Sequence, residues 1–264
     1  MTDTLRSEWL KLRTQRGTIV ALATTCVLMV GMTAFFASES ETNAVLGGDD
    51  DVVQNALTGV VFAQLAIVVA GASLITGEFG TGMIRTTFTA TQSRFRVLLA
   101  KALVLSLVTF PLALVTSIAA FLVAQPLLRD GGYVAPAYPP VSLTDPGVPR
   151  AVVGTALLLT AYALLALGVG AIVRHSGATI ATSIGLIFLP FLFLGAFPEH
   201  IRTKIEQLTP LAGMAIQSTN DRMLAPFDGR SGMPMGPWEG LGVAFAWALG
   251  ALVLGYALLR ARAA

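Results

Sequence analysis

The side chains best suited to binding a partner lie in one polar stretch, residues 77–101, which reads GEFGTGMIRTTFTATQSRFRVLLAK. A short helix here would present three apolar side chains to a pocket on another protein: Phe79, Met83 and Phe88. Glu78 and Arg85 would supply the charges that fix the register of such a contact. Three glycines in the first six residues lower the intrinsic helix stability. The stretch is therefore expected to need packing against another surface, and the chemistry predicted for it is non-covalent docking.

No catalytic constellation accompanies this stretch. The sequence has no GxxxxGK[ST] phosphate loop and no HExxH motif, and its two histidines, His175 and His200, lie far from the single cysteine, Cys26. The spacing of these residues matches no metal site. The sequence therefore predicts a protein that is not an enzyme, with no metal and no directly bound cofactor.

Composition places these residues in a membrane protein, since 55% of the chain is apolar and only 12% is charged. Soluble domains carry about a quarter charged residues, and a membrane helix needs roughly 20 mostly apolar residues. The predicted fold is an all-α integral membrane protein, with residues 1–264 forming a single transmembrane domain. Six apolar stretches are long enough to span the bilayer: 17–37, 55–76, 97–124, 151–173, 177–197 and 241–259.

Charge distribution predicts the orientation of these spans. With both termini in the cytoplasm, eleven basic residues fall inside and six outside, as the positive-inside rule requires. The net charge of +2 is too small to favour a nucleic-acid partner. A cleaved signal peptide is disfavoured because the first apolar run is about as long as a full span and no small-x-small pattern closes it.

Residues 1–16 are predicted to form an amphipathic helix, because Leu5, Trp9 and Leu12 recur at i, i+4 and i+7. A basic helix with a tryptophan suits the headgroup level of a bilayer. The alternative is a short solvated extension of the first span.

The outer segments differ in their expected structure. Six prolines in residues 125–150 predict an irregular loop. In residues 198–240, Ile201, Ile205 and Leu208 repeat at helical spacing, and Thr209 with Pro210 predicts the start of a second short helix running to about Met223.

The stretch 77–101 resembles the inner connection of permease subunits of the ABC type-2 exporter family. The matching positions are Glu78, Gly82, Ile84, Arg85, Ser93, Arg94, Leu98 and Lys101. The opening SEWLKLRTQRGT, with the spacing of Glu8 and Lys11, is also similar to the start of many bacterial members.

The resemblance implies a coupling helix that docks onto a separate ABC ATPase, which would hold the ATP and Mg. The coupling-helix residues would be Glu78, Phe79, Met83, Ile84, Arg85 and Phe88. It further implies a second permease copy in a homodimer, location in a bacterial cell membrane, and export. The alternative interpretation of Arg85, Arg94, Arg96 and Lys101 is that they only set the topology under the positive-inside rule.

The cores of the predicted spans hold no Asp, Glu, Lys or Arg, which argues against an ion-coupled carrier or a channel. Polar residues within spans usually hold helices together. Those that are candidates for a translocation path are Thr58, Gln64, Thr182 and Ser183. A mostly apolar path would suit an amphiphilic or hydrophobic cargo, such as a drug, antibiotic, peptide or lipid. The alternative function is a non-pumping membrane sensor or immunity protein on a permease-like scaffold.

Overall fold

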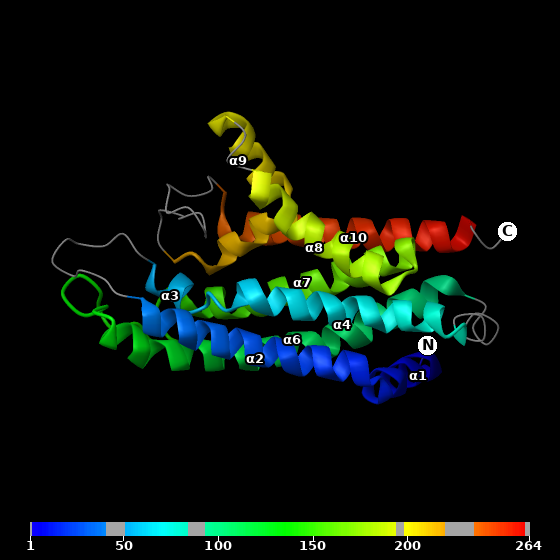
Figure 1. The fold of residues 1–264 in the computed structure, drawn as a ribbon, viewed down its shortest axis with the longest axis horizontal. Helices are drawn as coiled ribbons and strands as arrows, with labels where there is room; N and C mark the ends of the chain where they lie inside the picture. Colours follow the sequence, from blue (N-terminus) through cyan, green and yellow to red (C-terminus); the bar gives the residue numbers. More distant parts are fainter. Residues whose placement is uncertain (1, 41–50, 84–92, 194–197, 220–234, 262–264) are drawn as a thin grey trace.

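The structure is a computed structural model that describes residues 2–40, 51–83, 93–193, 198–219 and 235–261 (Figure 1). This part of the chain contains helices and no strands, which confirms the predicted all-α fold. The α-helices are α1 (Thr2–Thr14), α2 (Arg16–Glu39), α3 (Val52–Asn55), α4 (Val60–Gly80), α6 (Arg94–Asp130), α7 (Val148–Val173), α8 (Ser176–Phe193), α9 (Glu199–Leu208) and α10 (Pro237–Ala261). A 3₁₀ helix, η3 (Pro210–Gln217), lies between α9 and α10.

Five of the described helices are long and apolar enough to cross a membrane: α2, α4, α6, α7 and α10. The apolar stretch of α8, Ser176–Pro190, is shorter. Five of the six predicted spans thus correspond to helices of spanning length. The span predicted at 177–197 corresponds to α8, and its last four residues lie outside the described part of the chain.

The long helices run side by side, with α7 in the middle (Figure 1). α7 packs against α4, α6, α8 and α10, and most of its residues are buried. Close approach to α4 depends on Gly71, where a Cβ atom would lie 2.2 Å from the backbone oxygen of Ala163. A side chain at Gly71 would therefore force these two helices apart.

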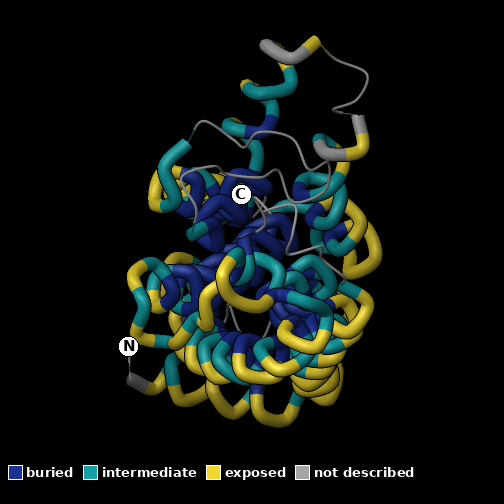
Figure 2. The backbone as a smooth tube through the Cα atoms, turned by 90° about the vertical axis from the view of Figure 1, so that its left-hand side faces the viewer, coloured by how far each residue is buried: buried dark blue, intermediate teal, exposed yellow. Residues whose placement is uncertain are grey.

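The outward faces of the bundle are apolar, so burial does not separate apolar from polar residues as it does in a soluble protein. Figure 2 shows that buried residues lie in the middle of the bundle and exposed residues lie around its outside. Large apolar side chains such as Val27 on α2, Leu107 on α6 and Val253 on α10 are about two-thirds exposed. Soluble monomers rarely carry apolar surface on this scale, whereas hydrocarbon solvates it without penalty.

The bundle has two distinct ends. The terminal end holds α1 and the last turn of α10, so both chain termini lie there (Figure 1). The far end holds α3 and the connection from α6 to α7 at residues 131–147.

Two predicted boundaries are wrong. α6 runs to Asp130 and contains both Pro111 and Pro126, so the irregular segment starts only at residue 131. Neighbouring helices tolerate proline in membrane helices by satisfying the freed backbone groups. α4 continues through Gly80, which places Glu78 in its last turn instead of in a separate surface helix.

Of the two short helices predicted in residues 198–240, only the first is predicted correctly. α9 contains the three residues at helical spacing, Ile201, Ile205 and Leu208. The second element begins at Pro210 as expected, but it is a 3₁₀ helix that ends at Gln217, short of Met223. All eight of its residues are buried, and it packs against α10 and α7. Tertiary packing therefore decides its conformation.

Polar contacts hold η3 in place at the far end. Asp51 caps α3 by accepting hydrogen bonds from the backbone of Val53 and Gln54. The same carboxylate accepts hydrogen bonds from the Thr219 hydroxyl, at 2.8 Å, and from the Thr219 backbone N–H. Arg150, in the first turn of α7, donates to the carbonyl of Ser218. We call Asp51, Arg150, Ser218 and Thr219 the far-end latch.

Candidate partner-docking site at the terminal end

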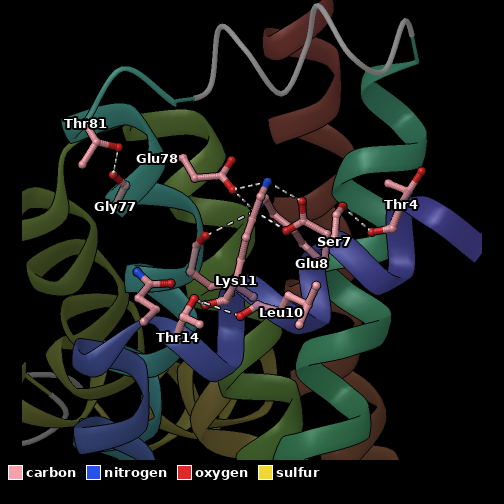
Figure 3. Close-up of polar contacts among 12 residues, drawn as sticks. Thr4, Ser7, Glu8, Leu10, Lys11, Thr14, Gly77, Glu78 and Thr81 are labelled. Carbon is pink, nitrogen blue, oxygen red and sulfur yellow. Dashed lines mark hydrogen bonds and ion pairs between the residues drawn. The ribbon is translucent and has the colours of Figure 1, made fainter.

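Four charged side chains from three helices meet at the terminal end. Figure 3 labels three of them, Glu8, Lys11 and Glu78. Glu8 and Lys11 come from α1, Glu78 from the last turn of α4, and Lys101 from the second turn of α6. The Lys101 ammonium lies 2.6 Å from Glu8 Oε2 and 2.7 Å from Glu78 Oε1. Lys11 lies 2.8 Å from both carboxylates. We call these four residues the ion-pair cluster.

The ion-pair cluster is buried and electrically balanced. Glu8 and Lys101 are each 1% exposed and Glu78 is 4% exposed, while Lys11 lies at the edge. Two carboxylates and two ammonium groups sum to zero charge, so no charge is buried without a counter-charge. Breaking such a pair by removing one partner costs about 3–5 kcal/mol, because the other charge then stays buried alone. The cluster therefore fixes α1, α4 and α6 relative to one another.

Burial alone would lower the pKa of Lys11. The hydrogen bonds and negative charges of Glu78 and Glu8 outweigh that effect and raise the Lys11 pKa above its usual 10.5. Lys11 is thus protonated at neutral pH and supplies one of the two positive charges that the cluster requires.

Apolar and polar contacts beside the cluster orient α1. Leu12 is buried and Leu5 packs against the core at partial exposure, whereas Trp9 is 43% exposed. Just after α1, the Gln15 amide donates to the carbonyl of Ser73 on α4, at 2.7 Å. The two leucines thus face the bundle and the tryptophan faces outward. The location of α1 at a membrane surface stays a prediction.

The predicted coupling-helix residues divide into three groups. Glu78 belongs to the ion-pair cluster, and Phe79 packs against the core with the Arg174 guanidinium 5.3 Å from its ring centroid, a cation–π distance. Met83 is 43% exposed. Ile84, Arg85 and Phe88 lie outside the described residues.

The candidate path residues are not gathered in one cavity. The Thr58 hydroxyl, just before α4, bonds to the carbonyl of Asn55, and the Ser183 hydroxyl on α8 bonds to that of Thr179. Gln64 on α4 is fully buried, and its amide makes no hydrogen bond within the described part of the chain. Thr182 is exposed on a cleft beside α8.

The sequence analysis named all four residues of the ion-pair cluster but did not predict that they pair with one another. Glu8 and Lys11 entered through their family spacing, and Glu78 and Lys101 as the two ends of a polar stretch. Two signals were available in the sequence. The two ends of this connection carry charges of opposite sign, Glu78 and Lys101, and α1 carries a Glu–Lys pair at i, i+3.

These features define a multi-pass helical membrane protein with a buried ion-pair cluster beside one connection. Residues 4–131, just under half of the chain, match the family model described as ABC-2 family transporter protein. The match supports the resemblance: over residues 4–131 the chain is similar to the ABC-2 family transporter proteins. No curated protein matches the chain.

Together with the long apolar helices, this similarity supports a role as a permease subunit, the membrane component of a transporter. All four residues of the ion-pair cluster fall within the matched range. The cluster therefore belongs to the part of the chain that the family model describes.

Proposed function

We propose that this chain is the permease subunit of an ATP-driven exporter whose ATPase is a separate protein. The observation that carries the proposal is the ion-pair cluster, which joins both ends of the α4–α6 connection to α1. Glu78 lies just before this connection and Lys101 just after its return into α6. A partner that moves the connection would therefore move three helices together.

In this proposal the terminal end faces the cytoplasm, with both termini inside, and the ATPase binds there with its ATP and Mg. The charge count supports that orientation. The connection would enter a groove on the ATPase, with Met83, Ile84, Arg85 and Phe88 as contact residues. Glu78 and Phe79 would have a different task, because both face the bundle: they anchor the start of the connection.

Transmission of movement requires a stiff link between the connection and the spans. Pairs at 2.6–2.8 Å with little water access resist separation, since splitting them leaves buried charges without partners. α1 packs against α6 and is joined to α4 by the Lys11–Glu78 ion pair. Nucleotide-driven closure of two ATPase subunits would be passed to α2, α4 and α6 through this link.

The proposed cargo is amphiphilic or hydrophobic, such as a drug, antibiotic, peptide or lipid, and export of drugs or antibiotics would confer resistance. The support is the apolar character of the spans. The second copy that completes the path would be an identical chain, giving a homodimer in a bacterial cell membrane.

The docking proposal is tested by co-purification with an ABC ATPase encoded beside this chain. Met83→Glu and Phe88→Glu should each reduce the ATPase recovered with the permease by at least tenfold while membrane insertion is unchanged. Phe79 is left intact because its ring packs against the bundle. Leu10→Glu is the matched control, since Leu10 is an exposed apolar side chain at the same end but on α1.

Recovery of the ATPase at the wild-type level with both variants would overturn docking through the connection. Failure of the wild-type chain to bind any ABC ATPase would instead favour the non-pumping sensor or immunity protein. The two results are distinguishable because the second appears without any substitution.

A further inference from the structure

The start of α6 contacts the end of α10 at the terminal end of the bundle. The Arg94 guanidinium donates a hydrogen bond to the carbonyl of Leu259. The Phe95 ring meets the Tyr256 ring edge to face, with 5.5 Å between the ring centroids. Arg94 and Phe95 are the first two residues of α6, and Tyr256 and Leu259 lie in the last two turns of α10. We call these four residues the α10 tether.

The charge of Arg94 suits α10 better than it suits its own helix. The N-terminus of a helix carries a partial positive charge, so a cation in the first turn is unfavourable there. The first turn of α6 nevertheless holds Arg94 and Arg96 and no acidic residue. The C-terminus of α10 carries the opposite partial charge, and its last carbonyls, that of Leu259 included, have no partner within the helix. Arg94 therefore breaks a local rule on α6 and gains its contact on α10, a pattern typical of functional positions.

The α10 tether lies where the proposed docking connection returns to the bundle. Ser93 caps α6 by accepting a hydrogen bond from the backbone N–H of Arg96, so Arg94 is the first residue of the helix after the connection. The ion-pair cluster takes its members from α1, α4 and α6. The α10 tether thus gives the connection a contact with a helix that the cluster does not include.

α10 extends this contact to the far end of the bundle (Figure 1). It runs from Pro237 to Ala261, and it packs against η3. A Cβ atom at Gly240 would lie 2.1 Å from the backbone oxygen of Ala212 in η3, so the two backbones are in direct contact. Trp247 Nε1 donates to the carbonyl of Leu208, just before η3, at 2.7 Å. A displacement of the end of α10 would therefore reach η3 along a continuous helix.

We infer that the α10 tether transmits movement of the docking connection to α10, and through α10 to η3. The inference rests on the proposed function and adds a second output to it: the ion-pair cluster moves α1, α4 and α6, whereas the tether moves α10. Arg94 and Phe95 act as positioning residues on this route. A guanidinium suits the task because its donors are fixed in one plane, so it holds the carbonyl of Leu259 in a defined direction.

Two reporters separate the two outputs. Cys26→Ser removes the single cysteine of the chain, and a new cysteine is then placed at Ser7 on α1 or at Ala257 on α10, both of which are exposed. The chain is labelled with bimane, combined with the ABC ATPase encoded beside it and reconstituted in nanodiscs. Addition of ATP and orthovanadate traps the closed ATPase, and the change in bimane fluorescence is recorded. The ratio of the Ala257 change to the Ser7 change measures the movement that reaches α10 and is independent of the fraction of active complex.

Arg94→Gln should lower this ratio by at least about twofold, the lower end of the effect expected for a residue on a coupling route. Arg96→Gln is the matched control, because Arg96 is the same residue type in the same turn and is exposed; it should keep the wild-type ratio. An unchanged ratio in Arg94→Gln, or an equal fall in both variants, would overturn the inference. Loss of the ATPase from Arg94→Gln alone would also overturn it, because Arg94 would then be a docking residue.

A second pair of variants covers the case in which Arg94→Gln fails to fold. Phe95 and Leu103 are both exposed apolar side chains of α6, and the Phe95 ring is the one that belongs to the α10 tether. Phe95→Ser should lower the ratio, and Leu103→Ser should leave it unchanged. A wild-type ratio in Phe95→Ser would contradict the inference independently of Arg94. Absence of a response at both reporters in the otherwise wild-type complex would instead overturn the proposed function, and the inference with it.

Discussion

The two ends of the bundle are held together by different chemistry. At the terminal end, four buried charges from three helices pair with one another. At the far end, the far-end latch uses one carboxylate and one guanidinium that bind mainly to backbone groups near η3. Buried charge pairs are lost together once one partner is removed, whereas hydrogen bonds to backbone contribute about 0.5–1.5 kcal/mol each, or about 1.5–3 kcal/mol when one group is charged.

This difference indicates that the ends have different mechanical roles. The ion-pair cluster joins α1, α4 and α6 into one unit beside the proposed docking connection. The far-end latch positions one short 3₁₀ helix against α7 and α10. A movement that starts at the terminal end would therefore involve whole helices, while the far end would respond through a local segment.

The largest effect is expected for Lys101→Met. The substitution removes one of the two positive charges and leaves Glu8 and Glu78 buried side by side with only Lys11 as a partner. We expect a loss of about 3–5 kcal/mol in the free energy of unfolding, with proteolytic release of α1. Denaturant unfolding in detergent measures the first and limited proteolysis the second.

Arg13→Met is the control for Lys101→Met, because Arg13 is exposed at the same end. It should change stability by no more than about 0.5 kcal/mol. A charge exchange, Glu78→Lys with Lys101→Glu, should recover part of the lost stability if pairing is the cause. An exchange that is no better than the single variants would show that the geometry of the cluster, and not its charge balance, is what stabilises α1.

A smaller effect is expected for Asp51→Ala at the far end. The variant loses the cap of α3 and the bonds to Thr219, so we expect a destabilisation of about 1–3 kcal/mol. The same unfolding measurement applies. Asp145→Ala is the control, because the Asp145 carboxylate accepts a hydrogen bond from the backbone N–H of Ser142 at an exposed site. Destabilisation greater than that of Lys101→Met would reverse the ranking of the two ends.

The smallest effect concerns the pH dependence of Lys11. Its pKa in the folded chain is raised above 10.5, so its contribution to stability is complete below pH 10.5. The contribution is lost as the pH rises through the higher folded value. The stability difference between the wild type and Lys11→Met should therefore be constant from pH 7 to about 10 and shrink above pH 10.5.

The titration of groups other than Lys11 affects the free energy of unfolding of both proteins. It therefore cancels when the value for Lys11→Met is subtracted from that of the wild type. A difference that instead shrinks between pH 7 and 9 would contradict a raised pKa. It would also show that Lys11, at the edge of the cluster, does not supply one of the two positive charges that balance Glu8 and Glu78.

Much of the fold could be predicted from local patterns. The apolar runs marked the long helices, and the spacing of Ile201, Ile205 and Leu208 marked α9. Which side of each span faces the interior could not be predicted, because spans such as α2 are apolar all round and have no amphipathic stripe. In the structure, the buried positions of α2 include small and hydroxyl side chains such as Thr18, Thr25 and Thr33, which allow close packing.

The candidate site was predictable only in part. The sequence by itself determined that the chain enters a membrane and that residues 77–101 form a polar connection between two apolar runs, because both follow from composition and order along the chain. The tertiary structure alone decided that Glu8 meets Lys101, 93 residues away, and that Glu78 meets Lys11, 67 residues away. It also decided the 3₁₀ form of η3 and the cleft beside α8. Each of these depends on the relative placement of helices, which local periodicity does not encode.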